Sequence, residues 1–424
     1  MTEAVNDPTR WDWRQGLRYG FMGFPLAFVA LPLYVVLPNY YARAFGVPLA
    51  TLGALLLSAR LFDAVIDPLL GRWSDRLFAR SPAAVLGWGG VAAVALGIGF
   101  AMLFFPPVSA MQPLLVWAAV SLVLTYTAFS GLSILHQSWG AMLGGNEAKR
   151  SGIVAWREGL GLPGVIVASI MPVVIGMTAT TGVFFLALAG GWWFWSRGVR
   201  PAVAPTGPAP VQVSVWLPFS RPGFRALLAV FVVNGIATAV PATLIMFFVQ
   251  DRLQAPVKME PLFLGSYFVC AALAMPLWLR LVKRIGLART WGLGMLLAIA
   301  VFVFASQLGA GDALGFLAVT SLSGIALGTD LALPGAMLAG TIQANGDSGR
   351  SEGAYFGWWN FATKLNLALA AGVALPALGI LGYAPGSQDA AALQTLTIAY
   401  CVLPCALKLL AAAMLYLLII RKPL

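Results

Sequence analysis

The chain has 424 residues, of which 60% are hydrophobic and 10% charged, and its mean hydropathy is +0.86. A soluble protein could not bury that much apolar surface, so the composition indicates a polytopic membrane protein. The formal net charge of +11 would suit a nucleic-acid-binding protein, but the basic residues lie in short segments between long apolar runs. We therefore expect a lipid bilayer, and no nucleic acid, around this chain.

Long apolar runs without the alternation of β-strands predict an all-α protein, because only helices and closed barrels satisfy the backbone in lipid. The polar N-terminal segment carries no cleavable signal pattern, so the first span should remain in the protein. We count twelve apolar spans, at 15–40, 48–71, 83–105, 112–143, 152–177, 180–196, 224–250, 259–282, 288–308, 314–343, 353–381 and 390–420. Residues 197–223 are rich in proline and basic at both ends, which predicts a cytoplasmic loop between two six-helix halves, 1–196 and 224–424.

The basic residues also predict the orientation in the membrane. With both termini in the cytoplasm, twenty Lys and Arg residues fall in cytoplasmic segments, and the outer loops hold only Arg43, Arg252 and Lys258. The positive-inside rule therefore favours a multi-pass protein of the cytoplasmic (inner) membrane with both termini inside.

The second span carries three charges. Arg60, Asp63 and Asp67 follow one another at helical positions i, i+3 and i+7, so they project from one face. Each charge would cost about 2.5–3.5 kcal/mol at the bilayer centre, so this face should meet a protein interior or a water-filled cavity. Arg60 could simply pair with one carboxylate and join two helices. A pair needs one acid, however, and two are present, which favours a cation site.

The two halves resemble each other in sequence. The tetrapeptide Gly-Ala-Met-Leu occurs at 140–143, near the end of the fourth span, and again at 335–338 in the tenth. A basic segment follows each copy. Matching positions in the two halves indicate an internal duplication, as in transporters built from two parallel repeats.

Several motifs resemble a known family. Residues 71–80 contain Gly71, Asp75, Arg76 and Arg80 in the spacing of the loop signature of the major facilitator superfamily. Three other pieces are similar to the glycoside–pentoside–hexuronide:cation symporters of the melibiose permease type: residues 60–68, residues 138–157 and residues 350–364. The resemblance implies a twelve-helix major facilitator fold with a central cavity that opens alternately to each side.

The resemblance also implies roles for individual residues. It makes Asp63 and Asp67 cation-binding carboxylates, with Na⁺ as one candidate ion, and it places Arg157 at the sugar. Arg157 could instead be a cytoplasmic anchor, since it lies near the start of its span. Lys364, in the eleventh span, could help to bind the solute and should need a partner such as Asp63 or Asp67. The other charged residues, which we expect to form a charge network and gate, are Arg60, Asp75, Arg76, Arg80, Asp330 and Arg350.

Some features depart from the family pattern. Melibiose-type members carry an acid on the first helix, whereas residues 20–39 hold no acidic or basic residue. The third cation-site acid, on the fourth span, is also missing, and its place falls to Ser130 or His136. His136 could sense protons or be a hydrogen-bonded core residue. Asp330, in the tenth span, could replace an acid that relatives place later in that span.

Polar and aromatic residues on the helices that line the cavity in relatives could help to hold the solute. These are Gln137, Trp139, Tyr355 and Asn360. A sugar ring stacks well on aromatic faces, but such residues could equally contact an acyl chain or a neighbouring helix. The aromatics therefore leave the substrate open.

Other functional classes are less consistent with this sequence. A primary pump would need a nucleotide site, but the chain has no Walker-type motif, and an enzyme would need a catalytic constellation. We expect a monomeric secondary transporter with no cofactor, which imports a small organic solute with H⁺ or Na⁺. A sugar or glycoside is the first candidate solute and a lysophospholipid or other amphiphile the second. A non-transporting receptor or assembly factor on the same scaffold is a further alternative.

Overall fold

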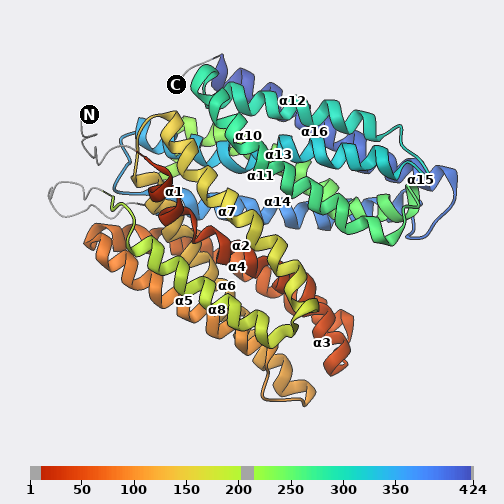
Figure 1. The fold of residues 1–424 in the computed structure, drawn as a ribbon, viewed down its shortest axis with the longest axis horizontal. Coiled ribbons are helices and arrows are strands. Elements are labelled where there is room, and N and C mark those ends of the chain that lie inside the picture. Colours follow the sequence, from red (N-terminus) through yellow and green to blue (C-terminus); the bar gives the residue numbers. More distant parts are fainter. Residues whose placement is uncertain (1–10, 202–213, 422–424) are drawn as a thin grey trace, which may run out of the picture. The chain divides into compact units, whose positions relative to one another are not determined.

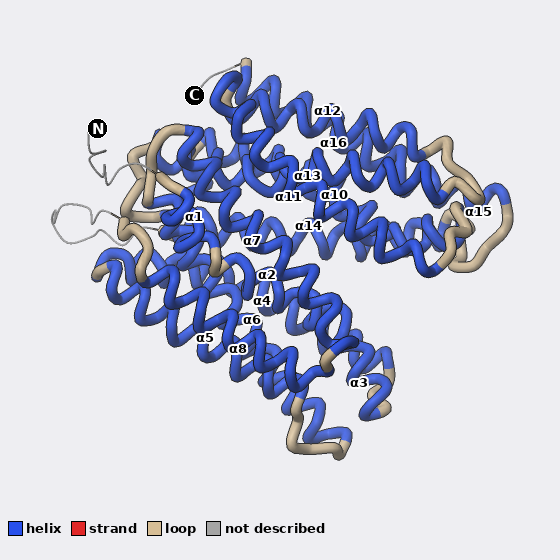
Figure 2. The backbone as a smooth tube through the Cα atoms, in the orientation of Figure 1, coloured by secondary structure: helices blue, strands red, loops and turns tan. Residues whose placement is uncertain are grey.

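The computed structural model describes residues 11–201 and 214–421, and every regular element in these ranges is a helix (Figure 2). Part of the expected central loop, residues 202–213, lies outside the described residues. Each of the twelve predicted spans coincides with helical structure, so the prediction of an all-α protein is confirmed. Within the described part, nine helices are long and apolar enough to cross a membrane.

The chain divides into two compact units. The first contains residues 1–63 and 74–209, and the second contains residues 64–73 and 210–424. Residues 64–73 therefore belong to the second unit, although they lie within a helix of the N-terminal half.

The helices of the N-terminal half are named in chain order in Figure 1. They are α1 (Trp13–Gly20), α2 (Gly23–Leu31), α3 (Leu37–Phe45), α4 (Leu49–Arg80), α5 (Pro82–Phe104), α6 (Met111–Met142), α7 (Glu147–Val174) and α8 (Gly176–Ser196), with a π-helical turn at Pro32–Val36. Together α1, α2 and α3 cover the first predicted span.

The C-terminal half starts with the short helix α9 (Leu217–Ser220). It continues with α10 (Pro222–Phe247), α11 (Glu260–Ile285), α12 (Leu287–Ala305), α13 (Ala313–Ala344), α14 (Glu352–Ile380), α15 (Ala390–Thr397) and α16 (Leu403–Leu415), a 3₁₀ turn at Val257–Met259 and π-helical turns at Phe248–Arg252, Ile398–Val402 and Tyr416–Ile420. The last predicted span thus consists of α15, α16 and two π-helical turns.

Capping residues explain where several helices begin. The side chains of Asp12, Ser81 and Asn146 accept hydrogen bonds from the backbone N–H groups of Gln15, Ala84 and Lys149, at 2.8, 3.0 and 3.0 Å. These bonds satisfy N–H groups that have no partner within the first turn of a helix. Between α11 and α12 the chain turns at Gly286, whose φ of 82° favours glycine.

The same helix pairings occur in both halves. In the first, α2 packs on α7, and α5 packs on α6 and α8; in the second, α10 packs on α14, and α12 packs on α13 and α16. In span order, the first span of each half thus contacts the fifth, and the third contacts the fourth and sixth. This recurrence is what an internal duplication would produce.

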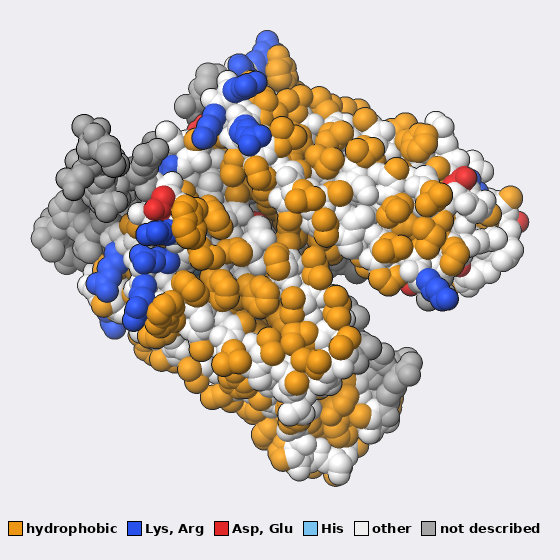
Figure 3. Space-filling view, in the orientation of Figure 1, with side chains coloured by type: hydrophobic (Ala, Val, Ile, Leu, Met, Phe, Trp, Pro, Cys, Tyr) orange, Lys and Arg blue, Asp and Glu red, His pale blue; other side chains and the backbone are white. Residues whose placement is uncertain are grey.

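The flanks of the helices are strongly apolar. Large hydrophobic side chains such as Val65, Val116, Leu186 and Leu273 are more than half exposed, at 66, 65, 74 and 74%. Figure 3 shows hydrophobic side chains covering the flanks and Lys and Arg gathered mainly at helix ends. Such a surface suits lipid along the flanks and water at the ends.

Candidate solute and cation site

The three charged residues Arg60, Asp63 and Asp67 of helix α4 lie in two different environments. Asp63 and Asp67 are buried, with 2 and 0% of their surface exposed, whereas Arg60 is exposed. The two acids lie one helical turn apart, which is the spacing at which side chains share a face. Since a buried carboxylate needs polar or charged partners, the contacts of each acid decide what it can do.

Asp63 contacts a neighbouring helix of the first unit. The hydroxyl of Ser130, on α6, donates a hydrogen bond of 2.7 Å to Asp63 Oδ1. Ser130 is only 1% exposed, so this contact lies deep in the unit. A hydroxyl adds no charge and can offer an oxygen, so it would leave the carboxylate able to accept a proton or a cation.

Asp67 forms an ion pair within the second unit. The Nζ atom of Lys364, on α14, lies 2.8 Å from Oδ1 and 2.7 Å from Oδ2 of Asp67. The Lys364 side chain keeps 19% of its surface exposed, whereas Asp67 has none. Asp63 and Asp67 were both possible partners of Lys364 from the sequence, and in the structure Lys364 pairs with Asp67.

Glycines allow this approach. A Cβ atom at Gly71 of α4 would lie 2.1 Å from the carbonyl oxygen of Gly353, and one at Gly357 of α14 would lie 2.6 Å from the carbonyl oxygen of Asp67. Real Cβ atoms do not come this close to a backbone oxygen, so a side chain at either position would force the helices apart. The glycines therefore set the distance that the Asp67–Lys364 pair needs.

His136 lies in a different setting from Ser130. It is fully buried, its ring is stacked on that of Tyr19 with centroids 4.3 Å apart, and the edge of Trp195 packs against it. His136 Nε2 lies 2.9 Å from the carbonyl oxygen of Tyr19, and the Tyr19 hydroxyl donates to the carbonyl of His136. This reciprocal bonding joins α1 to α6 and corresponds to the core role that the sequence left open.

Arg157 pairs with its neighbour in the sequence. Its guanidinium donates two hydrogen bonds to Oε1 of Glu158, the one from Nε measuring 3.0 Å, and the two side chains are 20 and 25% exposed. A Cβ at Gly23 would lie 2.1 Å from the carbonyl oxygen of Arg157, so α2 packs directly on this part of α7. Glu158 was not predicted, because consecutive helical residues do not face each other.

The other expected solute-binding residues are spread over several contacts. Trp139 is 1% exposed, and its indole donates to the carbonyl of Val199 at 3.0 Å. The Tyr355 hydroxyl donates to Asp347 Oδ2 at 2.7 Å. Gln137 and Asn360 are half-buried. The contacts of Trp139 and Tyr355 thus connect each side chain to the loops that follow α8 and α13.

Asp347 organises the loop between α13 and α14. Arg221 contacts both of its oxygens, with Nε at 3.0 Å and Nη2 at 2.8 Å. Hydrogen bonding to Asp347 raises the pKa of Arg221 above its ordinary value. The other charged motif residues differ in position and exposure. Asp75, Arg76 and Arg80 lie in the last turns of α4 and not in a loop, whereas Arg350 follows α13. Asp75 is half-buried, and the other three are exposed.

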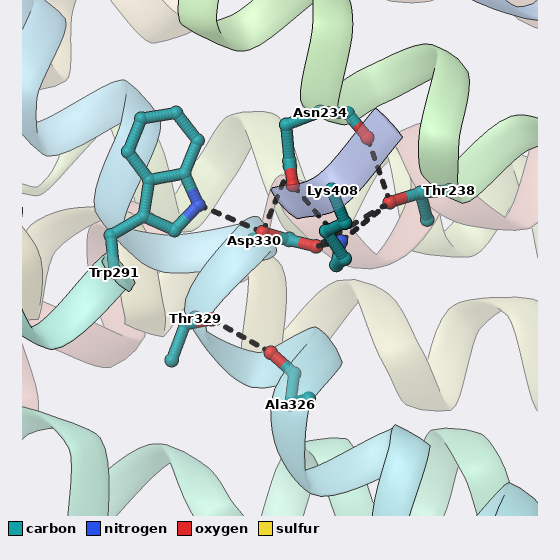
Figure 4. A network of polar contacts seen from close by, with 7 residues as sticks. All are labelled: Asn234, Thr238, Trp291, Ala326, Thr329, Asp330 and Lys408. Atoms are coloured by element: carbon teal, nitrogen blue, oxygen red, sulfur yellow. Dashed lines mark hydrogen bonds and ion pairs between the residues drawn. The ribbon is translucent and has the colours of Figure 1, made fainter. Parts of the chain in front are cut away.

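A second, partly buried ion pair lies in the second unit (Figure 4). Lys408 Nζ, from α16, donates to Asp330 Oδ2, Asn234 Oδ1 and Thr238 Oγ1 at 2.9, 3.0 and 3.1 Å. Asp330 Oδ1 accepts from Asn234 and from the Trp291 indole, at 3.0 and 2.8 Å. The sequence had placed Asp330 in a charge network but left Lys408 unassigned, although the two are opposite charges within spans of one half.

Oxygen ligands for a metal ion are few. Asp63 and Ser130 in the first unit, and Asp67 in the second, each carry oxygens of the kind that a hard cation prefers. Among the residues that the structure describes, no three His, Cys, Asp or Glu side chains gather as a metal site would require.

Comparisons with known proteins agree with this picture. The family model described as MFS/sugar transport protein matches residues 18–422. The chain is 23% identical over 414 residues to YjmB of Bacillus subtilis (strain 168), an uncharacterized symporter, covering 92% of this chain and 88% of that protein. It is 25% identical over 163 residues to YagG of Escherichia coli (strain K12), a putative glycoside/cation symporter, covering 38% of this chain and 35% of that one.

Solved structures share the fold. A bacterial homologue of the iron transporter ferroportin, in an outward-facing state, matches with a TM-score of 0.71 and 18% identity, covering 95% of this chain and 97% of that one. The major facilitator superfamily transporter FucP, in the outward conformation, matches with a TM-score of 0.66 and 15% identity, covering 94 and 98%. At such identities the likeness concerns the fold.

Proposed function

The chain belongs to the MFS/sugar transport family of the major facilitator superfamily, and we propose that it is a proton-coupled symporter that imports a sugar or glycoside. The resemblance of its motifs to cation symporters is confirmed at the level of the family. The chain is thus a multi-pass membrane transporter with the major facilitator fold, and not an enzyme. The solute, the coupling ion, the monomeric state and the cytoplasmic position of both termini belong to the proposal.

The Asp67–Lys364 ion pair, with Asp63 one turn away, is the observation that carries the proposal. A fully buried carboxylate in lipid is costly, and its retention indicates a functional role. Lys364 forms an ion pair with Asp67, and we assign proton uptake to Asp63, one turn earlier on the same helix. Its contact with a neutral hydroxyl favours a proton over Na⁺, which prefers several oxygen ligands.

The proposed coupling between cation and solute depends on the charges of Asp63, Asp67 and Lys364. A positive charge that binds at Asp63 or Asp67 reduces the negative charge near the Lys364 ammonium. It therefore weakens the attraction between Asp67 and Lys364. The ammonium of Lys364, whose side chain is 19% exposed, then becomes available to the solute's hydroxyls. In this scheme cation and solute each raise the other's affinity, as linkage requires.

Arg157 is the proposed second solute contact. The Arg157–Glu158 pair offers both donors and acceptors and is 20 to 25% exposed. Sugar hydroxyls lose water on binding and need partners of both kinds. The family description, which names sugar transport, supports a sugar over an amphiphile.

The first experiment identifies the solute and then tests the acids. Purified protein is screened for sugars, glycosides and lysophospholipids that raise its melting temperature, since a ligand of the folded state stabilises it. Uptake of the best ligand is then measured in proteoliposomes with an imposed proton gradient. We expect Asp63→Asn and Asp67→Asn each to abolish accumulation.

Asp312→Asn is the matched control, because this acid is exposed in a loop, where it accepts a hydrogen bond from the Gly309 N–H. It should accumulate solute like the wild type. Normal concentrative uptake by both α4 variants would refute the proposed coupling. Stabilisation by lysophospholipids and by no sugar would refute the proposed solute. Uptake that requires external Na⁺ and resists a protonophore would refute proton coupling.

A further inference from the structure

A cavity inside the second unit lies next to the Asp330–Lys408 pair. Its volume is about 170 Å³, and its walls come from α10, α11, α12, α13, α16 and the π-helical turn before α16. Most of the lining is apolar, including Phe268, Phe302 and Ile299. The charged pair, Thr238 and Ser323 are among its polar lining residues.

One face of α13 runs along the cavity. Val319, Ser323, Ala326 and Asp330 all line it, at helical positions that share a side. At 1.5 Å per residue, this stripe extends for about 16 Å. The cavity is therefore elongated along the helix, with the ion pair toward one end of the stripe.

The hydroxyl of Ser323 is available for a ligand. Ser323 is 6% exposed, and its Oγ is buried without a hydrogen-bond partner among the described residues. An unpartnered buried hydroxyl costs free energy, and a ligand that bonds to it recovers that cost. Thr320, one turn away, already contacts Ser266 at 3.1 Å, whereas the Ser323 hydroxyl has no such contact among the described residues.

The Asp330–Lys408 pair at one end of the cavity disfavours a charged ligand. The ammonium of Lys408 donates to three acceptors, and both oxygens of Asp330 accept hydrogen bonds. The pair has no net charge, and the three N–H donors of the Lys408 ammonium already have acceptors. A charged ligand would lose its hydration without gaining a counter-charge, whereas a neutral ligand would not.

We propose that this cavity binds a small uncharged aromatic molecule that carries one hydroxyl, of the size of a phenol or cresol. A cavity of about 150 Å³ with apolar walls accepts benzene, so the volume fits a single ring. The ring packs between Phe268 and the apolar wall, and its hydroxyl bonds to Ser323 Oγ. None of the residues that line this cavity belongs to the proposed cation and solute contacts, and the test needs no transport.

Equilibrium dialysis of radiolabelled p-cresol against the full-length protein in detergent tests the proposal, with protein-free micelles as background. We expect one saturable site per chain. Ser323→Ala should weaken p-cresol binding about 3- to 10-fold, the usual effect of one hydrogen bond. The same variant should leave competition by toluene unchanged, since toluene has the ring without the hydroxyl. Ala326→Leu should abolish binding, because it fills the cavity next to Ser323.

Ser321→Ala is the matched control, since Ser321 lies on the same helix but bonds to the carbonyl of Leu317 at 2.8 Å. It should bind p-cresol like the wild type. A second readout is alkylation of Cys405, which lines the cavity, with Cys270 elsewhere on α11 as the internal reference. Bound p-cresol should slow the reaction of Cys405 only.

Three results would overturn the proposal. The first is the absence of saturable binding to the wild type. The second is unchanged affinity in Ala326→Leu together with normal folding by size-exclusion chromatography. The third is an equal loss of affinity in the Ser323 and Ser321 variants.

Discussion

Removing Lys364 should expose how much the second unit depends on its ion pair with Asp67. Lys364→Ala leaves a carboxylate that is 0% exposed without its ammonium, whose Nζ lies 2.7–2.8 Å from both oxygens. Breaking a buried pair in this way costs about 3–5 kcal/mol. Because the Lys364 side chain is 19% exposed, we expect the lower end, about 3 kcal/mol.

The opposite substitution should cost less. In Asp67→Asn the remaining ammonium can reach water, since Lys364 keeps part of its surface exposed. The double variant, Asp67→Asn with Lys364→Ala, should recover at least half of the loss, because no unbalanced charge is left buried. Lys364→Ala should therefore lose more stability than Asp67→Asn, because Asp67 is more deeply buried than Lys364.

Thermal unfolding followed by tryptophan fluorescence measures all three variants. A loss of about 3 kcal/mol corresponds to a fall of roughly 6–12 °C in the melting temperature of a unit of this size. Lys283→Ala, which removes an exposed lysine near the end of α11, is the control and should change little. Equal melting temperatures for wild type and Lys364→Ala, or a double variant less stable than the single one, would refute the reasoning.

Two other substitutions test the solute contact and the N-terminal residue of α14. Arg157→Ala should weaken equilibrium binding of the transported sugar by about 2–5 kcal/mol, the usual cost of losing one partner of a buried charged contact; unchanged affinity would remove Arg157 from the solute site. Burial raises the pKa of Glu352, which precedes the predicted span 353–381, to about 7 from its ordinary 4.5. The folded state thus holds this proton more tightly, so wild-type stability should fall as pH rises from about 4.5 through 7. In Glu352→Gln that fall should be absent from the melting temperatures, and an identical pH profile in both proteins would contradict the assignment.

The fold could be predicted from the sequence because each membrane span is determined by the length and hydrophobicity of its own segment. Each span is long and apolar enough to be recognised alone, and the burial of Asp63 and Asp67 followed from their shared helical face. The choice of Asp67 as the partner of Lys364 did not follow, since Asp63 was an equal candidate. That choice depends on the close approach of α4 and α14 at Gly71 and Gly357.

Contacts that depend on tertiary packing remained hidden. Asp330 and Lys408 are 78 residues apart, and the sequence indicates only that two opposite charges lie in spans of the same half. The stacking of His136 on Tyr19 is likewise a tertiary contact that the sequence does not reveal. The repeat of Gly-Ala-Met-Leu did indicate the duplication, which recurs in the helix pairings of both halves.

Proton movement driven by outward sugar flow tests the proposed proton-coupled symport most directly. Proteoliposomes are loaded with the transported sugar and diluted into sugar-free medium with no ion gradient, while internal and external pH are recorded. If the chain is a proton symporter, outward sugar flow must carry protons and acidify the medium, because coupling acts in both directions. The acidification should disappear in Asp63→Asn. Sugar efflux at wild-type rates with no movement of protons would contradict proton-coupled symport.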